Sequence, residues 1–297
     1  MLGIPSRELL YVAKNSDKFY SPAKPRYKKD GTLREIYRVS EPLKLIQRRI
    51  LRRIFHRIEF PNYLKGGIKG GSPIDNARFH SNKRTLVRED VQNFFPSIDE
   101  TLVKEVWKYF FKFPDPIAEI CTKLTTFNGV VPQGARTSTY IANLILWDKE
   151  PLLELRLRKK GLSYTRFVDD VNVSSKRVLE VRKLQWVQDK VKAIFSSKVL
   201  TLNSEKSVVQ MENERMSVHD LTVNGPTPAL SKEKQRDLKR DLENLEENSS
   251  FKVADQLVRI KSLKGKIGYW NQIQPRKASR YINRLQSIQA KDQHGLE

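Results

Sequence analysis

The chain has 297 residues, with 56 Lys and Arg against 34 Asp and Glu, which gives a formal net charge of +22. A chain of this length buries a substantial core and is expected to form roughly two or three subdomains. The positive surplus, with aromatic residues interleaved, favours nucleic acid over a membrane surface as the binding partner.

Cysteine content and hydropathy exclude two further classes of protein. The single cysteine, Cys121, rules out an internal disulfide framework and is typical of a reducing cytosol. Residues 1–14 lack the charged head and long apolar run of a signal peptide, and the longest apolar run, residues 140–147, is far too short to span a bilayer. We therefore expect a cytoplasmic protein with no membrane partner.

The first part of the chain predicts a basic hairpin and an arginine-rich helix. Asp30-Gly31 is a strong two-residue turn signal between the basic arms of residues 27–39. Cations on such a finger can reach over a triphosphate, although an ordinary basic surface hairpin fits the pattern equally well. From Pro42 to Ile58 apolar residues recur at helical spacing, which predicts a helix packed on the core. Five arginines cover the rest of this helix and can face phosphates: Arg48, Arg49, Arg52, Arg53 and Arg57.

Residues 66–72 form a glycine-rich loop. The loop lacks the Lys-Ser/Thr ending and the strand–helix context of a nucleotide-binding P-loop, so we expect it to be either flexible or closely packed. Residues 76–80 then predict a short helix capped by Ser72 or Asp75. His80 in this helix is typical of a structural hydrogen-bonding residue, since nothing else in the sequence would complete a zinc site.

A strand and two helices are predicted next. Residues 84–90 read as a strand that ends at Asp90, and residues 100–111 as a helix with one apolar side. A longer helix is opened by residues 130–138, where Gln133 and Gly134 precede several hydroxyl side chains. An amide, a glycine that permits close approach and a helix N-terminus suit a bound nucleotide, although a simple capped helix shows the same pattern.

Residues 163–175 predict two strands joined by a tight turn at Asp169 and Asp170. Aspartate is common in turns, so the pair alone is typical of a solvated bend. Adjacent carboxylates repel each other, however, and become favourable only opposite a strong cation. If the strand that ends at Asp90 lies beside this hairpin, three carboxylates converge at one sheet edge. Such ligands suit Mg²⁺, and two ions about 4 Å apart can clamp the two oxygens of an in-line phosphoryl transfer.

The remaining elements complete a ferredoxin-like order and add a helical end. A helix at 178–195 and a strand at 202–209 give the order strand, helices, strand, strand, helix, strand, which is the split βαβ arrangement. Ser231 can cap a first terminal helix, apolar spacing at 253–260 indicates a second, and Pro275 begins a third. Basic residues edge these helices and can grip a duplex backbone: Lys261, Lys264, Lys266, Arg276, Lys277 and Arg280.

From about residue 28 to residue 285 the chain resembles bacterial reverse transcriptases, most closely those of retrons. The resemblance rests on an ordered set of motifs: the finger that ends in Arg34, the helix with residues 43–47, Asp90 followed by Phe-Phe-Pro-Ser-Ile at 94–98, Pro-Gln-Gly at 132–134, Phe-Val-Asp-Asp at 167–170, residues 202–206 and Leu-Thr-Val-Asn at 221–224. Asn-Ala-Arg-Phe-His at 76–80 is similar to the Asn-Ala-x-x-His signature of retron enzymes. Val-His-Asp at 218–220 stands where those enzymes usually carry Val-Thr-Gly, which leaves room for a related defence-associated reverse transcriptase.

The resemblance implies an α+β right-hand polymerase fold. Residues 1–84 would form the fingers, and residues 85–228 a ferredoxin-like palm with finger insertions at about 100–130. Residues 229–297 would form the helical thumb. A catalytically idle RNA-binding module on the same sheet is the alternative, but it would not need three aspartates that can bind metal.

The resemblance also implies roles for individual residues at the site. Asp90, Asp169 and Asp170 would hold two Mg²⁺ ions, with Mn²⁺ as the alternative metal and the Val91 carbonyl near the second ion. Phe95 would be the steric gate under the sugar, because an aromatic ring excludes a ribose 2′-OH. This argues against a second alternative, an RNA-dependent RNA polymerase. The remaining nucleotide contacts would be Lys28 and Arg34 on the triphosphate, Gln133 and Gly134 along the nucleotide, and Lys206 at the leaving pyrophosphate.

The partners implied are a structured noncoding RNA that serves as template and primer, the RNA–DNA duplex, dNTPs and an effector protein. The residues expected to contact RNA share a basic or polar side chain outside the catalytic edge: Arg52, Arg53, Asn76, Arg78, His80, His219, Lys264, Lys266, Arg276, Lys277 and Arg280.

Overall fold

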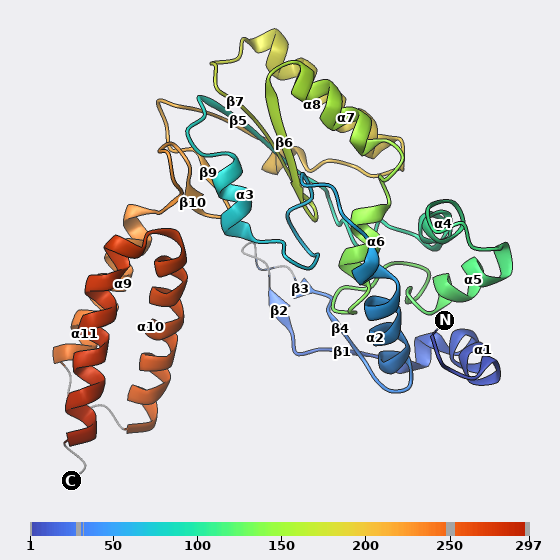
Figure 1. Cartoon of the computed structure of the whole chain (residues 1–297), viewed down its shortest axis with the longest axis horizontal. Coiled ribbons are helices and arrows are strands. Elements are labelled where there is room, and N and C mark those ends of the chain that lie inside the picture. The colour runs from blue at the N-terminus through green and yellow to red at the C-terminus, as the bar shows by residue number, and fades with distance from the viewer. Residues whose placement is uncertain (1, 28–30, 32, 248–252, 295–297) are drawn as a thin grey trace. The chain divides into compact units, whose positions relative to one another are not determined.

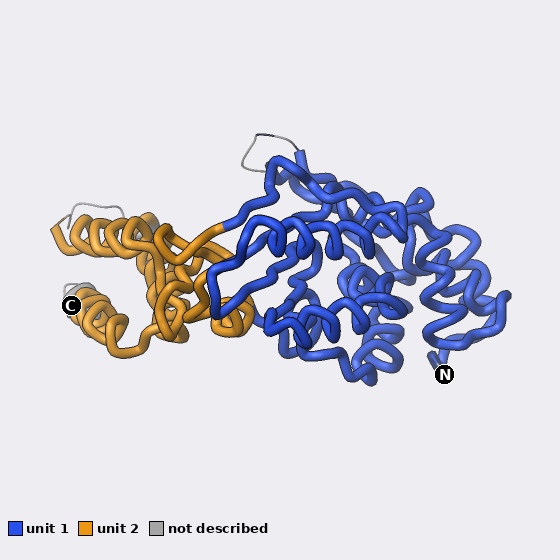
Figure 2. The backbone as a smooth tube through the Cα atoms, turned by 90° about the horizontal axis from the view of Figure 1, so that it is seen from above, with its two compact units in different colours: residues 1–72, 85–209 blue, residues 73–84, 210–297 orange. Residues whose placement is uncertain are grey.

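The computed structural model describes residues 2–27, 31, 33–247 and 253–294 (Figure 1). The chain divides into two compact units, residues 1–72 with 85–209 and residues 73–84 with 210–297 (Figure 2). These two units do not correspond to the expected fingers, palm and thumb, so the boundaries of those three parts stay a prediction.

The first unit is built around a four-stranded sheet. Its strands are β5 (Thr85–Asp90), β6 (Leu162–Phe167), β7 (Asp170–Ser175) and β8 (Val208–Met211), the last of which contains the boundary between the units. The strands lie in the order β6-β7-β5-β8, and β7 runs antiparallel to both of its neighbours. The first and third strands in the chain therefore lie at the centre of the sheet. This is the ferredoxin-like arrangement and confirms the expected α+β palm.

Helices α7 (Glu150–Lys159) and α8 (Val181–Ser196) pack against this sheet and against each other (Figure 1). α7 contacts β6, and α8 contacts β5. On α8 the fully buried residues Val187, Val191 and Phe195 recur every fourth position, which is the apolar stripe of a helix with one covered face. The sequence predicted α8 but not α7.

The other helices of the first unit surround an aromatic core. They are α1 (Ser6–Lys14), α2 (Leu43–Arg53), α4 (Glu100–Glu105), α5 (Asp115–Lys123) and α6 (Ser138–Leu144). The helix predicted to reach Ile58 ends at Arg53, and a separate 3₁₀ turn (Phe55–Arg57) follows it. The turn buries Phe55 with its ring 5.4 Å from that of Trp107, in the π-helical turn (Val106–Phe110) that continues α4. The sequence did not predict α5.

The basic hairpin forms as two pairs of short strands. β1 (Tyr20–Pro22) pairs with β4 (Tyr37–Val39), and β2 (Arg26–Tyr27) pairs with β3 (Leu33–Arg34). In this second pair Tyr27 is opposite Leu33. The turn expected at Asp30-Gly31 includes residues outside the described part of the chain and stays a prediction. Lys28 and Asp30 lie outside the described residues.

The second unit combines a small sheet with three long helices. Helix α3 (Pro73–Phe79) contacts β9 (Ser217–Val218) and β10 (Leu221–Thr222), and β11 (Ala229–Leu230) completes the sheet in the order β11-β10-β9. The long helices are α9 (Lys232–Glu247), α10 (Val253–Ile273) and α11 (Pro275–His294). They pack on one another around buried residues such as Trp270 and Tyr281, whose rings are 4.8 Å apart (Figure 1).

Two terminal signals in this unit are confirmed. Ser231 Oγ accepts the backbone N–H of Lys234 at 3.1 Å, which is the predicted cap of α9, and α11 begins at Pro275.

The strand expected at 202–209 is wrong in its first half, where a 3₁₀ turn (Ser204–Lys206) precedes β8. Within the described residues, no helix has the length and apolar character needed to cross a bilayer.

Candidate active site

The three aspartates meet at one end of the central strands of the palm. In the antiparallel ladder Asp90 of β5 is directly opposite Asp170 of β7, which is opposite Phe167 of β6. Val168 and Asp169 are therefore the two residues of the β6–β7 turn. The backbone N–H of Val91 donates to the Asp169 carbonyl at 3.2 Å, so the turn is tied to the end of β5.

The turn that carries Asp169 holds a strained residue. Val168 has a φ of +62°, a conformation that hairpin turns require but that a β-branched residue rarely adopts. Such a residue costs about 1–3 kcal/mol and persists only where the surrounding structure enforces it. The glycine-rich loop provides part of that enforcement. A Cβ on Gly66 would lie 2.5 Å from the Phe167 ring, and one on Gly67 would lie 3.0 Å from Val168 Cγ2. The loop is thus closely packed against the turn, one of the two alternatives that the sequence left open.

Asp90 is buried, Asp169 and Asp170 are half-buried, and the three carboxylates act on one another electrostatically. Burial first, and then the charges of Asp169 and Asp90, raise the pKa of Asp170 to about 7. Burial also raises the pKa of Asp169, with Asp90 acting in the same direction and the cations Lys206 and Arg34 opposing it. Burying like charges this close together is unfavourable unless a cation compensates them.

Lys206 supplies one such cation. Its Nζ lies 3.0 and 3.2 Å from the two Asp90 carboxylate oxygens. The backbone N–H of Asn203 donates to the Asp90 carbonyl at 2.8 Å, which fixes the turn that carries Lys206 beside the end of β5. The sequence placed Lys206 at the leaving pyrophosphate, and the structure brings it to the same carboxylate edge.

The donor set at this edge has the chemistry of a divalent-metal site. In the described part of the chain, no three His, Cys, Asp or Glu side chains are already arranged so that they could hold a metal ion. The hard oxygens of Asp90, Asp169 and Asp170 are nevertheless the ligands that Mg²⁺ and Mn²⁺ take, and their crowding is relieved by a cation. The residues therefore fit such an ion, with the Lys206 ammonium now on the carboxylate of Asp90.

A pocket of about 300 Å³ lies beside these carboxylates. Its lining residues are Arg88, Glu89, Asp90, Asp170, Glu205, Lys206 and Val208. Glu89 is buried and accepts hydrogen bonds from Gln188 Nε2 at 3.0 Å and from Ser207 Oγ at 2.9 Å. Its carboxylate is thereby held by the protein. Asp90 and Asp170 are the acidic lining residues at the paired ends of β5 and β7.

Of the predicted nucleotide contacts, Arg34 is exposed on β3, and its charge acts on Asp169. The Gln133 carbonyl accepts the Tyr37 N–H at 2.8 Å, which joins the loop before α6 to the hairpin. Gly134 has a φ of +105°, and a Cβ there would overlap the Tyr37 carbonyl oxygen, so the close approach seen here is to β4. Phe95 is half-buried, with its ring 5.9 Å from that of Phe94. Lys28 lies outside the described residues.

The RNA contacts predicted in the first unit lie at the end of α2. Arg52 and Arg53 are both exposed there. A neighbouring arginine, Arg49, is engaged within the protein, because its guanidinium donates to the Leu2 carbonyl at 3.1 Å and to the Gly3 carbonyl.

The signature residues at 76–80 are mostly buried in the second unit. Asn76 and His80 are fully buried, and Asn76 Nδ2 lies 2.8 Å from His219 Nε2. Arg78 pairs with Asp75 at 2.8 Å and donates to the Gln272 carbonyl at 3.0 Å. The structure thus brings Asn76 and His219 together in a contact within the protein.

His219 and Asp220 form the turn between β9 and β10. Their φ values of +49° and +64° are those of a primed hairpin turn, which normally favours Asn-Gly. Two basic side chains brace this turn. Lys234 Nζ lies 3.1 Å from Asp220 Oδ2, and Arg215 donates to the Asp220 carbonyl at 3.3 Å.

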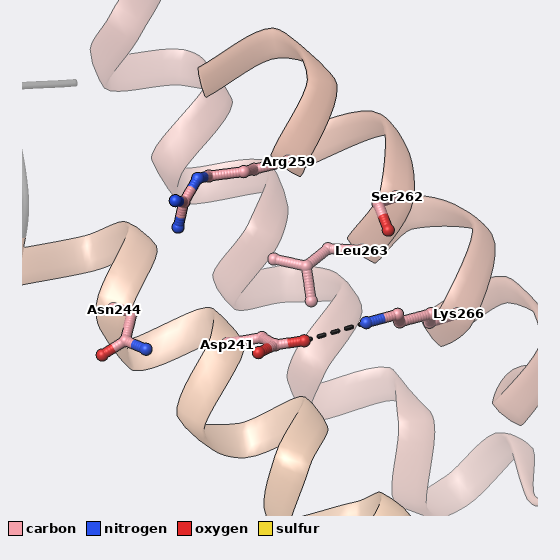
Figure 3. Close-up of a pocket in the computed structure, with 6 residues that line it drawn as sticks. All are labelled: Asp241, Asn244, Arg259, Ser262, Leu263 and Lys266. Carbon is pink, nitrogen blue, oxygen red and sulfur yellow. Dashed lines mark hydrogen bonds and ion pairs between the residues drawn. The ribbon is translucent and has the colours of Figure 1, made fainter. Parts of the chain in front are cut away.

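The basic residues predicted on the thumb are distributed over α10 and α11. Lys264, Arg276, Lys277 and Arg280 are exposed. Lys266 is also exposed, and it pairs with Asp241 of α9 at 2.9 Å beside a pocket of about 210 Å³ between α9 and α10 (Figure 3). The other lining residues of this pocket are Asn244, Arg259, Ser262 and Leu263.

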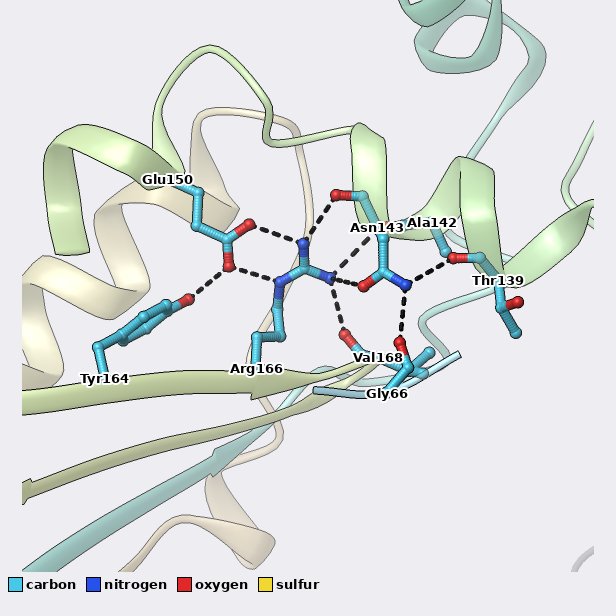
Figure 4. A network of polar contacts seen from close by, with 8 residues as sticks. All are labelled: Gly66, Thr139, Ala142, Asn143, Glu150, Tyr164, Arg166 and Val168. Carbon is cyan, nitrogen blue, oxygen red and sulfur yellow. Dashed lines mark hydrogen bonds and ion pairs between the residues drawn. The ribbon is translucent and has the colours of Figure 1, made fainter. Parts of the chain in front are cut away.

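Sequence reasoning missed a buried polar cluster directly behind the aspartate turn (Figure 4). Arg166 and Glu150 form an ion pair at 2.6 Å with both side chains buried, and the Tyr164 hydroxyl donates to the same carboxylate at 2.7 Å. The alternation of side chains along a strand could have predicted that Arg166 is buried. It lies on the same covered face of β6 as Leu162 and Tyr164. A charged residue at such a position needs a buried partner.

Comparisons with known proteins agree with this geometry. The family model described as "Reverse transcriptase (RNA-dependent DNA polymerase)" matches residues 27–248. The retron Se72 reverse transcriptase of Salmonella heidelberg (strain 579083-10) is 34% identical over 239 residues, which cover 80% of this chain and 63% of that protein. The retron Ec48 reverse transcriptase of Escherichia coli is 31% identical over 228 residues, 73% of this chain and 55% of that protein. The chain thus spans less than two thirds of the length of these two relatives.

A third relative and a solved structure cover the chain in similar measure. The retron Ec86 reverse transcriptase of Escherichia coli is 26% identical over 239 residues, 80% of this chain and 73% of that protein. The solved structure of telomerase from Candida albicans with a fragment of telomeric RNA aligns with a TM-score of 0.46 and 12% identity. That alignment covers 84% of this chain and 47% of the telomerase chain. Because that family model matches residues 27–248, which is most of this chain, the chain belongs to the reverse transcriptase (RNA-dependent DNA polymerase) family.

Proposed function

We propose that the chain is an RNA-directed DNA polymerase that reverse-transcribes a structured noncoding RNA. One observation carries the proposal: strand register and the β6–β7 turn bring Asp90, Asp169 and Asp170 to one sheet edge, where they are at least half-buried and act on one another electrostatically. A module that only binds RNA has no use for carboxylates in an arrangement that a cation must compensate. Membership of the reverse transcriptase family supports the same activity.

The chemistry proposed is nucleotidyl transfer at this edge. Asp90, Asp169 and Asp170 would hold two divalent ions, Mg²⁺ or Mn²⁺, with the Val91 carbonyl as a further oxygen. When bound, such ions lower the pKa of the attacking hydroxyl and neutralise charge on the triphosphate. Arg34, whose charge acts on Asp169, would bind the triphosphate. Lys28, which lies outside the described residues, would bind it too. Lys206 would move from Asp90 to the departing pyrophosphate.

Selection of the sugar is assigned to Phe95. The residue follows the Asp90 strand and is only half-buried. A ring in this position would exclude a 2′-OH, whereas a polymerase that makes RNA needs a polar residue to accept it. Deoxynucleotides are therefore the proposed substrate, and RNA-dependent RNA synthesis is disfavoured.

The proposed template is a noncoding RNA that stays bound to the protein. The net charge of +22 and the exposed cations of α11 support a polyanionic partner. The relatives named above are retron reverse transcriptases, so we place this chain in a retron or related anti-phage system in the bacterial cytoplasm, with an effector protein as a further partner.

The test is to express the protein together with the DNA that flanks its gene and to sequence the nucleic acid that co-purifies. The proposal expects one structured RNA together with DNA complementary to part of it. An RNA bound without any complementary DNA would favour the idle RNA-binding module instead. Ribonucleotide products complementary to the RNA would favour an RNA-dependent RNA polymerase.

A further inference from the structure

We propose that Arg166 is a positioning residue for nucleotidyl transfer: its guanidinium holds the Val168 carbonyl and so fixes the turn that presents Asp169 and Asp170. This inference rests on the proposed function, because it assigns the way in which the same site is kept in a productive shape. Neither the family match nor the names of the relatives assign a role to this residue.

The guanidinium of Arg166 is completely buried, and each of its three nitrogens donates to the protein (Figure 4). Nε and Nη2 form a bidentate pair with Glu150 at 2.6 and 2.7 Å. Nη1 donates to the Val168 carbonyl at 3.0 Å and to Asn143 Oδ1 at 3.3 Å, and Nη2 also donates to the Asn143 carbonyl at 3.0 Å. An arginine has five N–H donors in a rigid fork, and these contacts use all five.

The contact with Val168 is the one that reaches the active site. The Val168 carbonyl belongs to the peptide that leads into Asp169, and Val168 has the unfavourable positive φ of +62°. The next peptide is held from the other side, because Val91 N–H donates to the Asp169 carbonyl at 3.2 Å. Asp169 therefore lies between two anchored peptides, one tied to Arg166 and the other tied to the residue that follows Asp90.

Asn143 extends this support to α6 and the glycine-rich loop. Its side-chain Nδ2 donates to the Gly66 carbonyl and to the Thr139 carbonyl, each at 2.9 Å. Thr139 Oγ1 in turn donates to the Gly67 carbonyl at 2.6 Å. The loop that presses on Val168 is thus held by the same cluster that holds its carbonyl, and a displaced guanidinium would release both.

Stability alone is a poor reason for such a cluster. Replacing a buried ion pair by apolar residues of similar volume is often neutral or stabilising, so the pair is weak evidence for a contribution to folding. What apolar residues cannot do is donate a hydrogen bond to the Val168 carbonyl. A lysine cannot reproduce the fork either, since it carries its donors on one nitrogen.

The test compares three variants in single-nucleotide addition on an RNA template. Arg166→Lys keeps the charge but loses the fork. The triple variant Arg166→Met, Glu150→Leu, Tyr164→Phe removes both members of the buried pair together, so it leaves no uncompensated buried charge and is expected to fold. Arg158→Lys changes an exposed arginine that pairs with Glu154 on α7 and serves as the matched control.

Both cluster variants are expected to lower kcat by about 100-fold, the size expected when a catalytic group is misplaced by about 1 Å. The KM for the nucleotide and the Kd for RNA should stay unchanged, and Arg158→Lys should equal the wild type. In the metal-free proteins, amide hydrogen exchange should accelerate at residues 167–170 and not elsewhere in the sheet.

A triple variant that folds and adds nucleotides at the wild-type rate would overturn the inference, even if Arg166→Lys failed to fold. So would a loss of kcat that merely follows the unfolded fraction at the assay temperature. If the wild type itself adds no nucleotide, the proposed function fails. If the wild type and the cluster variants are equally active, the proposed function stands and only the role of Arg166 fails.

Discussion

At the scale of single residues, the candidate site depends on a few side chains held in unfavourable surroundings. Asp170 has a pKa raised to about 7 by burial and by its acidic neighbours. Val168 adopts a positive φ that β-branched residues avoid. Strain and buried like charge of this kind cluster at functional sites, because the rest of the fold must enforce them.

The first prediction concerns Phe95 and the choice of sugar. Phe95→Ala removes the ring that we propose lies beside the incoming sugar, so ribonucleotides should enter the product. Single-nucleotide addition with dNTPs and rNTPs measures the change, and Phe95→Tyr, which keeps the ring, should remain selective for dNTPs. Unchanged selectivity in Phe95→Ala would make this half-buried ring a packing residue and place the gate elsewhere.

At the scale of elements, the second unit depends on a turn that joins α3 to β9 and β10. His219 contacts the fully buried amide of Asn76 at 2.8 Å, whereas Asp220 on the same turn makes a half-exposed pair with Lys234. The two adjacent residues are therefore expected to contribute very differently to the free energy of unfolding. Losing a hydrogen bond to a buried group costs much more than losing an exposed ion pair.

The second prediction follows from this contrast. His219→Ala should lower the free energy of unfolding by about 1–3 kcal/mol, because the buried Asn76 amide loses its contact with the imidazole. Asp220→Ala, the control on the same turn, should cost no more than about 1 kcal/mol for its exposed pair. Chemical denaturation measures both. Equal losses in the two variants would mean that the turn itself, and not the contact between His219 and Asn76, stabilises this unit.

Elements whose cause is local were predictable from the sequence. The succession of strands and helices along the palm, the cap at Ser231 and the start of α11 at Pro275 all follow from periodicity and from the chemistry of helix ends. The convergence of Asp90 with Asp169 and Asp170 was predicted conditionally, because sequence can place acidic residues at strand ends but cannot pair the strands.

The features that sequence reasoning missed depend on contacts between distant segments. Arg166 is held by Glu150 and Asn143, which lie 16 and 23 residues away, and Asn143 reaches Gly66 across 77 residues. The role of Gly134 was likewise hidden, since its close neighbour, Tyr37, belongs to the hairpin. Side chains alone cannot show which distant backbone carbonyl a buried donor will meet.

At the scale of the whole molecule, the positive charge predicts binding to RNA but not which RNA. A net charge of +22 gives phosphate affinity that falls steeply with salt and is nearly indifferent to sequence. A dedicated RNA partner adds base stacking and hydrogen bonds, which do not release counterions and so survive higher salt.

The third prediction is that binding of the cognate RNA is specific at high salt. RNA encoded beside this gene should outcompete an unrelated retron RNA, and its advantage should grow from moderate to high salt. His219 and Asp220, which replace the usual Thr-Gly of retron enzymes, are expected to contribute to this discrimination. Competition binding at two salt concentrations measures it. Equal competition at both would show that the charge is generic and would remove the dedicated RNA from the account.

The central claim is that the aspartate edge carries out nucleotidyl transfer, and primer extension by Asp169→Asn and Asp170→Asn tests it most directly. Each substitution removes one carboxylate from the edge and leaves the basic surfaces intact. Asp189→Asn, which changes an exposed carboxylate on α8, is the control. The account predicts that both edge variants lose DNA synthesis on an RNA template while they bind RNA with wild-type affinity, and that the control keeps both. Primer extension near the wild-type rate by either edge variant would contradict it.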